Sequence, residues 1–225
     1  VCDDPLTVGM SKWPPYNIKT DAGWEGIDAD ILKLLGKEMD CEIKFETSPW
    51  TRTKKLIEYG KIDLGTQAGI TEKRKKYANF SNKYMKFQSS LWVGIQDDND
   101  YKSLTDFFRM GKMLGIKEGF DYGERVNGLV REKYANQTDS AEDLRINARL
   151  LAHGRIDGML GNPFVVGYRA RQEGVIQDIQ QSVVIQSEPV YFMLSKKSVS
   201  QGEIDAINEA IASLKEKGKI QQVLK

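Results

Sequence analysis

Short apolar runs alternate with longer amphipathic stretches through the first part of the chain. The runs have the length of buried strands, whereas the longer stretches repeat apolar residues at helical spacing. The pattern predicts a strand, a helix, a strand, a helix and a strand at residues 6–10, 27–39, 42–45, 50–59 and 62–65. Because parallel strands need crossover connections, this β-α-β-α-β order predicts a parallel sheet with right-handed crossovers.

The same alternation continues through the rest of the chain. It predicts strands at 90–95, 113–116, 158–160, 183–185 and 190–194, and helices at 122–134, 141–153 and 203–217. The last helix is amphipathic, with one stripe formed by Ile204, Ile207, Ile211 and Leu214. We therefore expect its apolar face to dock against the protein.

Two segments, Leu56–Gly65 and Leu151–Leu160, have nearly the same pattern: an apolar helical turn, a glycine, a basic residue, an isoleucine, an aspartate and a short strand. Glycine directly after an apolar helical turn is the expected C-cap, because it adopts φ > 0 without a steric clash. The repeat predicts two similar α/β lobes with a ligand cleft and a two-strand hinge between them. We expect lobe 1 at 1–95 plus 190–225, lobe 2 at 96–189, and the crossings at 96–101 and 186–189.

Composition narrows the possible functions. The 225 residues are 40% hydrophobic, which is enough for real cores, and no apolar run approaches the ~20 residues of a membrane span. Lysine plus arginine number 33 against 32 for aspartate plus glutamate, so the net charge of +1 argues against a nucleic-acid partner. The basic run Lys73–Lys76 is too short to change this conclusion. The sequence opens at Val1 without methionine, so we expect a processed mature protein or a trimmed chain from which any signal peptide has been removed.

Cys2 and Cys41 each precede a predicted strand. If those strands are parallel neighbours, both cysteines lie at the same sheet edge, and a disulfide between them would indicate an oxidising compartment. The alternative is two free cysteines in a cytosolic protein. One histidine and two distant cysteines match no metal-ligand spacing, so we expect no metal. That histidine, His153, ends a predicted helix, where a structural role is expected.

Several motifs together resemble the polar amino-acid-binding family of periplasmic solute-binding proteins, which serve ABC importers. They are Trp13-Pro14-Pro15-Tyr16, Gly26-Ile27-Asp28-Ala29-Asp30, Gly60-Lys61-Ile62-Asp63, Ile70-Thr71-Glu72-Lys73-Arg74, Phe80-Ser81 and Gly154-Arg155-Ile156-Asp157. Pro49-Trp50-Thr51-Arg52 and the cysteine pair further resemble a branch of stand-alone members. The resemblance implies an α/β, two-lobed periplasmic-binding-protein fold, each lobe a mostly parallel sheet flanked by helices. It also implies a monomer in the periplasm without cofactors.

Arg74 is the strongest candidate for a ligand contact. The resemblance implies that this arginine holds the α-carboxylate of the ligand, and a planar guanidinium suits a carboxylate better than lysine does. Thr71 is expected to cap the following helix and to direct its amides at the same anion. The resemblance places Thr66, Gln67 and Gly69 against the ligand as well. The plain alternative for Arg74 is a solvated basic helix start.

The resemblance also places three aromatic residues, Trp13, Tyr16 and Trp50, beside the ligand. Flat rings exclude water and sandwich a planar or aliphatic group, and a cation gains further from the ring face. For each aromatic residue the alternative is ordinary packing. Arg52 either points into the cleft or pairs with an acid on its rim.

The second lobe departs from the family pattern. The family often carries an ammonium-binding aspartate where this chain has Asn162, and small hydroxyl residues where it has Phe120, Asp121 and Tyr122. Asparagine offers an amide oxygen without charge. Either the ligand lacks an α-ammonium, or an acid such as Asp121 or Glu118 replaces the missing one.

We expect a non-enzymatic binding protein that closes on a small carboxylate-bearing ligand and delivers it to a permease. One alternative is the same module as a ligand sensor of a signalling receptor. The other is an enzyme similar to cyclohexadienyl dehydratase. That enzyme would need a cleft acid with a raised pKa, for which Asp121 and Glu118 are the candidates.

Overall fold

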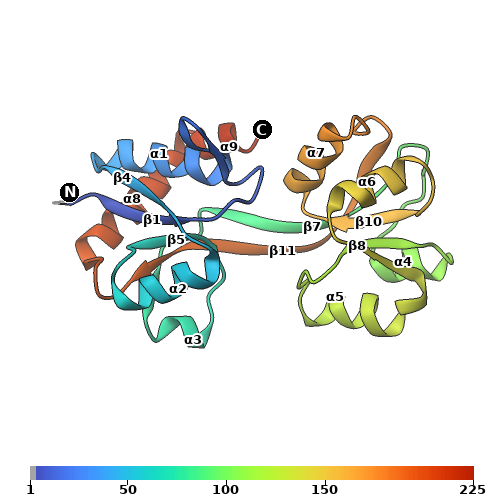
Figure 1. Cartoon of the computed structure of the whole chain (residues 1–225), viewed down its shortest axis with the longest axis horizontal. Coiled ribbons are helices and arrows are strands. Elements are labelled where there is room, and N and C mark those ends of the chain that lie inside the picture. Colours follow the sequence, from blue (N-terminus) through green and yellow to red (C-terminus); the bar gives the residue numbers. More distant parts are fainter. Residues whose placement is uncertain (1–3) are drawn as a thin grey trace. The chain divides into compact units, whose positions relative to one another are not determined.

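The structure, a computed structural model, describes residues 4–225. The chain forms two compact units, one from the residues up to Lys86 together with Glu188–Lys225, the other from Phe87–Ser187. The chain passes between them twice, within the long strands β7 (Met85–Gly94) and β11 (Ile179–Ser195). Figure 1 labels the elements of both units.

The first unit contains a mixed sheet. Strand β1 (Leu6–Met10) lies between β4 (Ile43–Thr47) and β5 (Leu64–Ala68) and is parallel to both. The end of β11 pairs antiparallel with β5 and with β6 (Ala78–Phe80), and β2 (Ile18–Thr20) and β3 (Gly23–Glu25) form a separate hairpin. The parallel β1, β4 and β5 arrangement follows the predicted β-α-β-α-β order.

Helices cover both faces of this first sheet (Figure 1). They are α1 (Ile27–Met39), α2 (Trp50–Tyr59), α3 (Glu72–Lys75), α8 (Gln201–Glu216) and α9 (Lys219–Val223). Helix α8 packs against α1 through the apolar stripe expected from the sequence, whose four residues are all buried. Its start carries a capping box formed by Ser200 and Glu203.

The second unit is built around the sheet β7-β10-β8-β9, in which β10 (Gly158–Gly161) is antiparallel to β7 and parallel to β8 (Leu114–Lys117). Strand β9 (Thr138–Ala141) extends the sheet parallel to β8. The helices are α4 (Leu104–Arg109), α5 (Glu124–Gly128), α6 (Leu144–Ala152) and α7 (Pro163–Gln172). A π-helical turn (Leu129–Lys133) and a 3₁₀ turn (Ala135–Gln137) follow α5.

Each unit therefore has the mixed α/β architecture of a periplasmic-binding-protein lobe, which confirms the predicted fold class. Some predicted elements were wrong in detail. The helix expected at 122–134 is α5 followed by the π-helical turn, and the segment expected to begin a helix at 141 is the end of β9. The two strands expected at 183–185 and 190–194 belong to the single strand β11.

The repeated motif performs the same structural task in both units. Gly60 and Gly154 follow α2 and α6 with φ of 71° and 64°, as the C-cap prediction requires. Asp63 Oδ2 accepts a hydrogen bond from Thr7 N (2.7 Å), and Asp157 Oδ2 accepts one from Met113 N (2.8 Å). Each aspartate thus ties the start of one strand to the chain segment that opens its parallel neighbour, so the motif is a structural connection.

Candidate functional site

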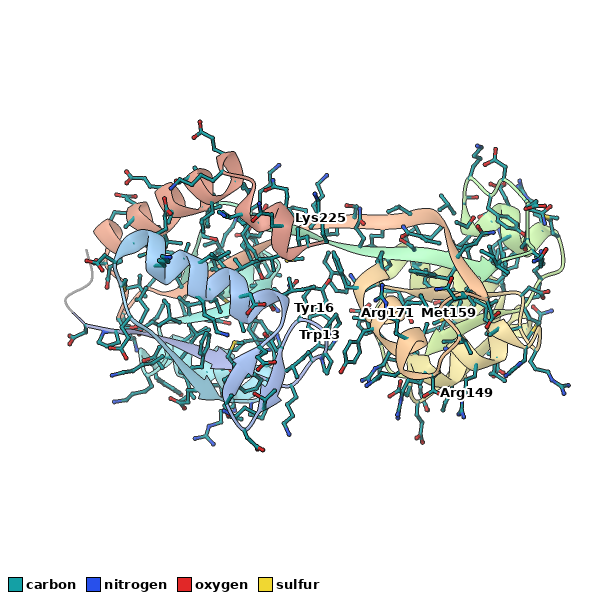
Figure 2. All side chains as sticks on the ribbon, turned by 90° about the horizontal axis from the view of Figure 1, so that it is seen from above. Trp13, Tyr16, Arg149, Met159, Arg171 and Lys225 are labelled. Carbon is teal, nitrogen blue, oxygen red and sulfur yellow. The ribbon has the colours of Figure 1, made fainter. Side chains whose placement is uncertain are left out.

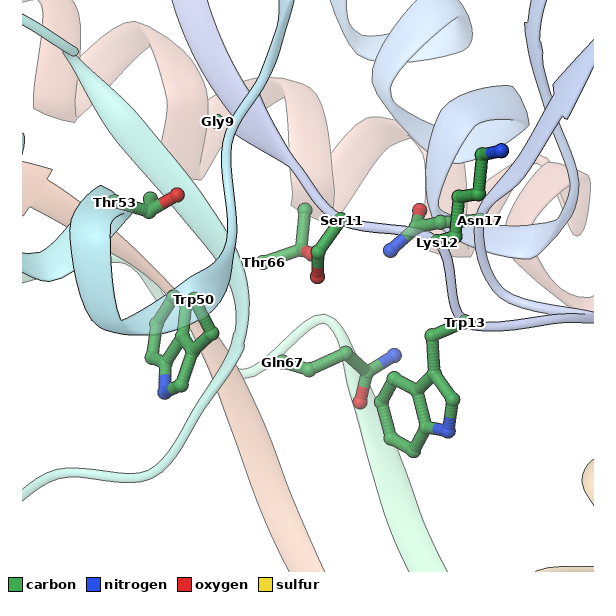
Figure 3. Close-up of a pocket in the computed structure, with 9 residues that line it drawn as sticks. All are labelled: Gly9, Ser11, Lys12, Trp13, Asn17, Trp50, Thr53, Thr66 and Gln67. Atoms are coloured by element: carbon green, nitrogen blue, oxygen red, sulfur yellow. The ribbon is translucent and has the colours of Figure 1, made fainter. Parts of the chain in front are cut away.

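A pocket of about 290 Å³ opens at the carboxyl ends of β1 and β5 in the first unit (Figure 3). Its lining residues are Gly9, Ser11, Lys12, Trp13, Asn17, Trp50, Thr53, Thr66 and Gln67. Ligands of open α/β sheets commonly bind at the carboxyl ends of the strands. Of the residues expected at the ligand, Trp13, Trp50, Thr66 and Gln67 line this pocket.

Two glycines allow α2 to lie close to the sheet at the pocket. A Cβ atom on Gly9 would come within 2.5 Å of Thr53 Cγ2, and one on Gly65 within 2.9 Å of Trp50 Cζ3. Either distance is too short for a real contact, so α2 presents Trp50 and Thr53 to the pocket because these positions lack side chains. Sequence reasoning identified Trp50 but missed Gly9 and Thr53.

Trp13 is positioned by a tight loop between β1 and β2. Trp13 N donates to Asn17 O (2.9 Å), and Asn17 N donates to Trp13 O (3.0 Å). Tyr16 lies beside Trp13, with ring centroids 4.7 Å apart (Figure 2), and is fully buried. Trp13 lines the pocket, whereas Tyr16 packs against Trp13 and does not line the pocket.

Arg74 lies beside the Trp50 side of the pocket. Its guanidinium carbon is 5.5 Å from the centre of the Trp50 ring, and its Nη1 donates to Gly69 O (2.7 Å). Thr71 caps α3 by accepting from Arg74 N, which confirms the predicted cap. Gly69 contributes its carbonyl oxygen to the placement of Arg74. Arg52 is exposed on α2, and within residues 4–225 it forms no ion pair.

Asp28 is a buried acid in the first turn of α1, and it contacts Gln67, one of the residues that line the pocket. Its Oδ1 accepts hydrogen bonds from Gln67 Nε2 (2.9 Å) and Tyr84 Oη (3.0 Å). Complete burial raises the pKa of Asp28 to about 6, although hydrogen bonding to Gln67, Tyr84, Thr66 and Asn17 opposes this rise. The sequence carried a signal for this residue, since Asp28 shares the buried face of α1 with Ile31, Leu32 and Leu35.

Gln67 connects this acid to the pocket. It is a non-glycine residue with φ of 53°, a left-handed backbone conformation that is uncommon outside glycine. Gln67 N donates to Tyr84 Oη (3.0 Å), and Tyr84 Oη donates to the Asp28 carboxylate. Tyr84 therefore contacts the backbone of Gln67 and also the acid that accepts a hydrogen bond from the Gln67 side chain. Tyr84 is fixed in turn by stacking on Phe192.

The candidates in the second unit have structural partners within that unit. Tyr122 is buried, accepts a hydrogen bond from Lys117 N and donates one to Leu160 O, and Phe120 packs edge-on against it. Asp121 is exposed and accepts hydrogen bonds from Gly123 N and Asn127 Nδ2, which lower the pKa of its carboxyl. The dehydratase alternative needed a raised pKa at such an acid, so Asp121 does not support it.

Asn162 caps α7. Its Oδ1 accepts hydrogen bonds from Phe164 N (3.0 Å) and Val165 N (3.2 Å), and its Nδ2 donates to Gln88 O (3.0 Å). The side chain is 5% exposed. Both ends of the amide therefore serve local structure.

Cys41 is buried after α1, whereas Cys2 lies outside the described residues, so their expected disulfide stays a prediction. Within the described part of the chain, no group of three or more potential metal-binding side chains comes together. No helix among residues 4–225 is both long and apolar enough to cross a membrane.

Comparison with known proteins gives a family assignment. The family model of bacterial extracellular solute-binding proteins, family 3, matches residues 6–225. The arginine-binding periplasmic protein of Mannheimia haemolytica is 25% identical, with 97% of this chain and 88% of that protein covered. The ABC transporter arginine-binding protein 1 of Escherichia coli is 24% identical, with coverages of 98% and 89%.

The fold is also found among solved structures. Substrate binding domain 2 of GlnP from Lactococcus lactis, solved in an open conformation, superposes with a TM-score of 0.78 at 20% identity. The match covers 99% of this chain and 94% of that one. At this level of identity the likeness establishes the fold alone.

Proposed function

The chain belongs to the bacterial extracellular solute-binding proteins, family 3, and we propose that it binds a small carboxylate-bearing solute, an amino acid or a related metabolite, for delivery to an ABC permease. We propose that it acts as a monomer in the periplasm and binds its ligand without converting it. The relatives named above are binding proteins that match over most of their length, two of them named for arginine.

The proposal that the ligand has a carboxylate rests on the placement of Arg74. Its guanidinium is held over the face of Trp50, a pocket residue, by one hydrogen bond to Gly69 O. A guanidinium has five N–H donors, and among residues 4–225 Gly69 O is the one acceptor that it contacts. Donors remain for a bidentate contact with a carboxylate, while the Trp50 ring limits the orientation of the guanidinium plane.

The aromatic side chains support a ligand with a flat or aliphatic body. Trp13 and Trp50 come from different elements and border the same pocket (Figure 3). Their rings exclude water from a group placed between them, and they favour a cation or a planar amide over an anion. A ligand with a carboxylate at Arg74 and its body between the tryptophans satisfies both features.

We further propose that the ligand has no α-ammonium. The position where the family often has an aspartate is Asn162, and both ends of its amide are engaged in capping α7 and in binding Gln88 O. An uncharged, engaged amide is a poor partner for an ammonium group. L-Arginine and 5-guanidinopentanoate form a matched pair for testing this proposal, because they differ only in the α-ammonium.

The experiment is a thermal-shift screen of the twenty L-amino acids, simple carboxylates and the matched pair. Native mass spectrometry of the freshly purified protein would detect a co-purified small molecule in parallel. A stabilising carboxylate-bearing ligand whose effect is lost in Arg74→Ala supports the proposal. A ligand without a carboxylate, or full binding by the Arg74→Ala protein, would refute it.

A further inference from the structure

Three segments of the first unit concentrate positive charge on its surface. They are residues 54–61 in and after α2, residues 72–77 in and after α3, and residues 196–197 in the turn after β11. These segments hold nine of the 33 lysine and arginine residues of the chain and two of its 32 aspartate and glutamate residues. They therefore carry a net charge of +7, whereas the rest of the chain carries −6. The net charge of +1 for the whole chain conceals this asymmetry.

Contacts between the three segments show that they adjoin. Lys196 Nζ donates a hydrogen bond to Lys75 O, directly after β11 and at the end of α3. A Cβ atom on Gly60 would come within 2.9 Å of Lys197 Cβ, and Lys197 Nζ lies 5.7 Å from the centre of the Tyr59 ring. The turn after β11 therefore contacts α3 through one lysine and the end of α2 through the next, so the three segments form one surface.

The basic side chains of this surface, apart from Arg74, are all lysines. We call them the lysine patch: Lys54, Lys55, Lys61, Lys73, Lys75, Lys76, Lys196 and Lys197. All of them except Lys54 are exposed. Two acids, Glu58 and Glu72, lie in the same segments, and Glu72 pairs with Lys75 at 2.7 Å. These two acids leave most of the positive charge of the patch uncompensated.

The use of lysine in place of arginine indicates the kind of partner. Arginine is enriched and lysine is depleted in interfaces between proteins, where a guanidinium forms directed, bidentate contacts. Lysine is a mobile and strongly hydrated point charge, which suits a diffuse layer of negative charge. The headgroups of anionic lipids form such a layer, and each lysine close to it favours binding. The composition of the patch therefore favours a lipid surface over an acidic protein.

An exposed aromatic side chain lies within the same surface. Tyr59 is 64% exposed, the largest value among the exposed large hydrophobic side chains of residues 4–225. Lys197 Nζ lies over its ring. Tyrosine is enriched at membrane–water interfaces, because its ring is apolar and its hydroxyl stays in contact with water. A tyrosine beside lysines is thus a second feature that suits contact with lipid headgroups.

We propose that the lysine patch, together with Tyr59, is a contact surface for an anionic lipid membrane. This inference goes beyond the proposed function and does not depend on the identity of the ligand. The contact is electrostatic and brings the first unit to the membrane surface without insertion of a helix. It weakens as salt is added, because the screening length of about 10 Å at about 0.1 M salt becomes shorter.

The experiment measures cosedimentation of the purified protein with vesicles of phosphatidylcholine alone, and with vesicles that contain about one third phosphatidylglycerol. The protein should bind the anionic vesicles and not the neutral ones, and it should dissociate at about 0.5 M salt. The patch variant combines Lys55→Gln, Lys61→Gln and Lys197→Gln. Its affinity for the anionic vesicles should fall about 100-fold, because each lysine contributes roughly fivefold.

The matched control removes three exposed lysines from elsewhere in the first unit. It combines Lys19→Gln in β2 with Lys33→Gln and Lys37→Gln in α1. Helix α1 lies on the opposite side of the first sheet from α2 (Figure 1). The control and the patch variant have the same net charge, and the control should bind the anionic vesicles nearly as tightly as the wild type. Circular dichroism and thermal unfolding of both variants check that the fold is intact.

Three results would overturn the proposal: absence of binding to anionic vesicles, equal binding to neutral and anionic vesicles, or equal loss of binding in the patch variant and the control. Poly-L-glutamate serves as a model of an acidic protein partner. If it binds through the patch while anionic vesicles do not bind, the surface belongs to an acidic protein and the lipid proposal fails. None of these measurements uses the ligand of the pocket, so failure of this proposal and failure of the proposed function are distinguishable.

Discussion

The buried Asp28 should make the protein more stable in mild acid than at neutral pH, and Asp28→Asn should remove this dependence. Burial raises the pKa of Asp28 from 3.8 to about 6 in the folded protein. Because each pKa unit corresponds to about 1.4 kcal/mol, ionised Asp28 costs the folded state about 3 kcal/mol at neutral pH. The folded protein binds the proton more tightly, so this cost disappears as the pH falls below the pKa of the unfolded chain.

Integration between about pH 7.5 and about pH 4.5 leaves an expected gain of about 2 kcal/mol for the wild type relative to Asp28→Asn. Taking the difference between the two proteins cancels the other carboxyl groups, including Asp121 and Asp143, whose lowered pKa values destabilise the fold in acid.

The assay is urea unfolding of both proteins without ligand, followed by tryptophan fluorescence at the two pH values. Asp30→Asn serves as the control, because Asp30 is on the same helix with a half-exposed side chain that pairs with Lys33. A difference in free energy of unfolding between wild type and Asp28→Asn that is the same at both pH values would refute the reasoning. It would mean that burial does not raise the pKa of Asp28 as the structure indicates.

Three further predictions concern the remaining site residues and the cysteines. Arg74→Ala should weaken ligand binding by about 2–5 kcal/mol, which is at least about 30-fold. Arg74→Lys should also bind poorly, because the single ammonium of lysine does not reproduce the two parallel N–H donors of a guanidinium. Calorimetric titration checks this, and near wild-type affinity in Arg74→Ala would remove Arg74 from the site. Asn162→Asp should weaken binding of a ligand without an α-ammonium by roughly 1–3 kcal/mol, because such a ligand removes water from the new carboxylate without bringing an opposite charge. Tighter binding of L-arginine than of 5-guanidinopentanoate by the unmutated protein would contradict that interpretation. Thiol titration of denatured, unreduced protein should find almost no free thiol at Cys2 and Cys41, and two free thiols in protein made in the periplasm would exclude the disulfide.

Local sequence patterns were sufficient for much of the fold. The C-cap of α2 at Gly60, the positive φ of Gly154 just after α6, the Thr71 cap and the buried stripe of α8 were all predicted correctly. Each depends on interactions within a few residues of the chain, where backbone preference and helical spacing act directly. Strand β9 was missed because Thr138–Ala141 has no apolar run, and its pairing with β8 alone makes it a strand.

Several candidates from the sequence coincide with the pocket of the first unit. Trp13, Trp50, Thr66 and Gln67, which the family resemblance places at a ligand, line the pocket, and their contacts with a ligand stay predictions. Ser11, Lys12 and Asn17 were missed, because nothing in their local pattern distinguishes them from other polar residues of a loop. The contributions of Phe120, Asp121, Tyr122 and Asn162 to ligand binding remain predictions.

The sequence by itself therefore indicated the family and the order of most elements, and it predicts a carboxylate-binding role for Arg74. Only the tertiary structure decided that Asp28 is a buried acid in contact with Gln67, a residue that lines the pocket. That outcome depends on α1, β5 and the segment before β7 packing together, which buries the carboxylate and gives it Gln67 and Tyr84 as partners. Burial and the loss of water are collective properties of packed elements, so the raised pKa of Asp28 does not follow from the residues adjacent in the sequence.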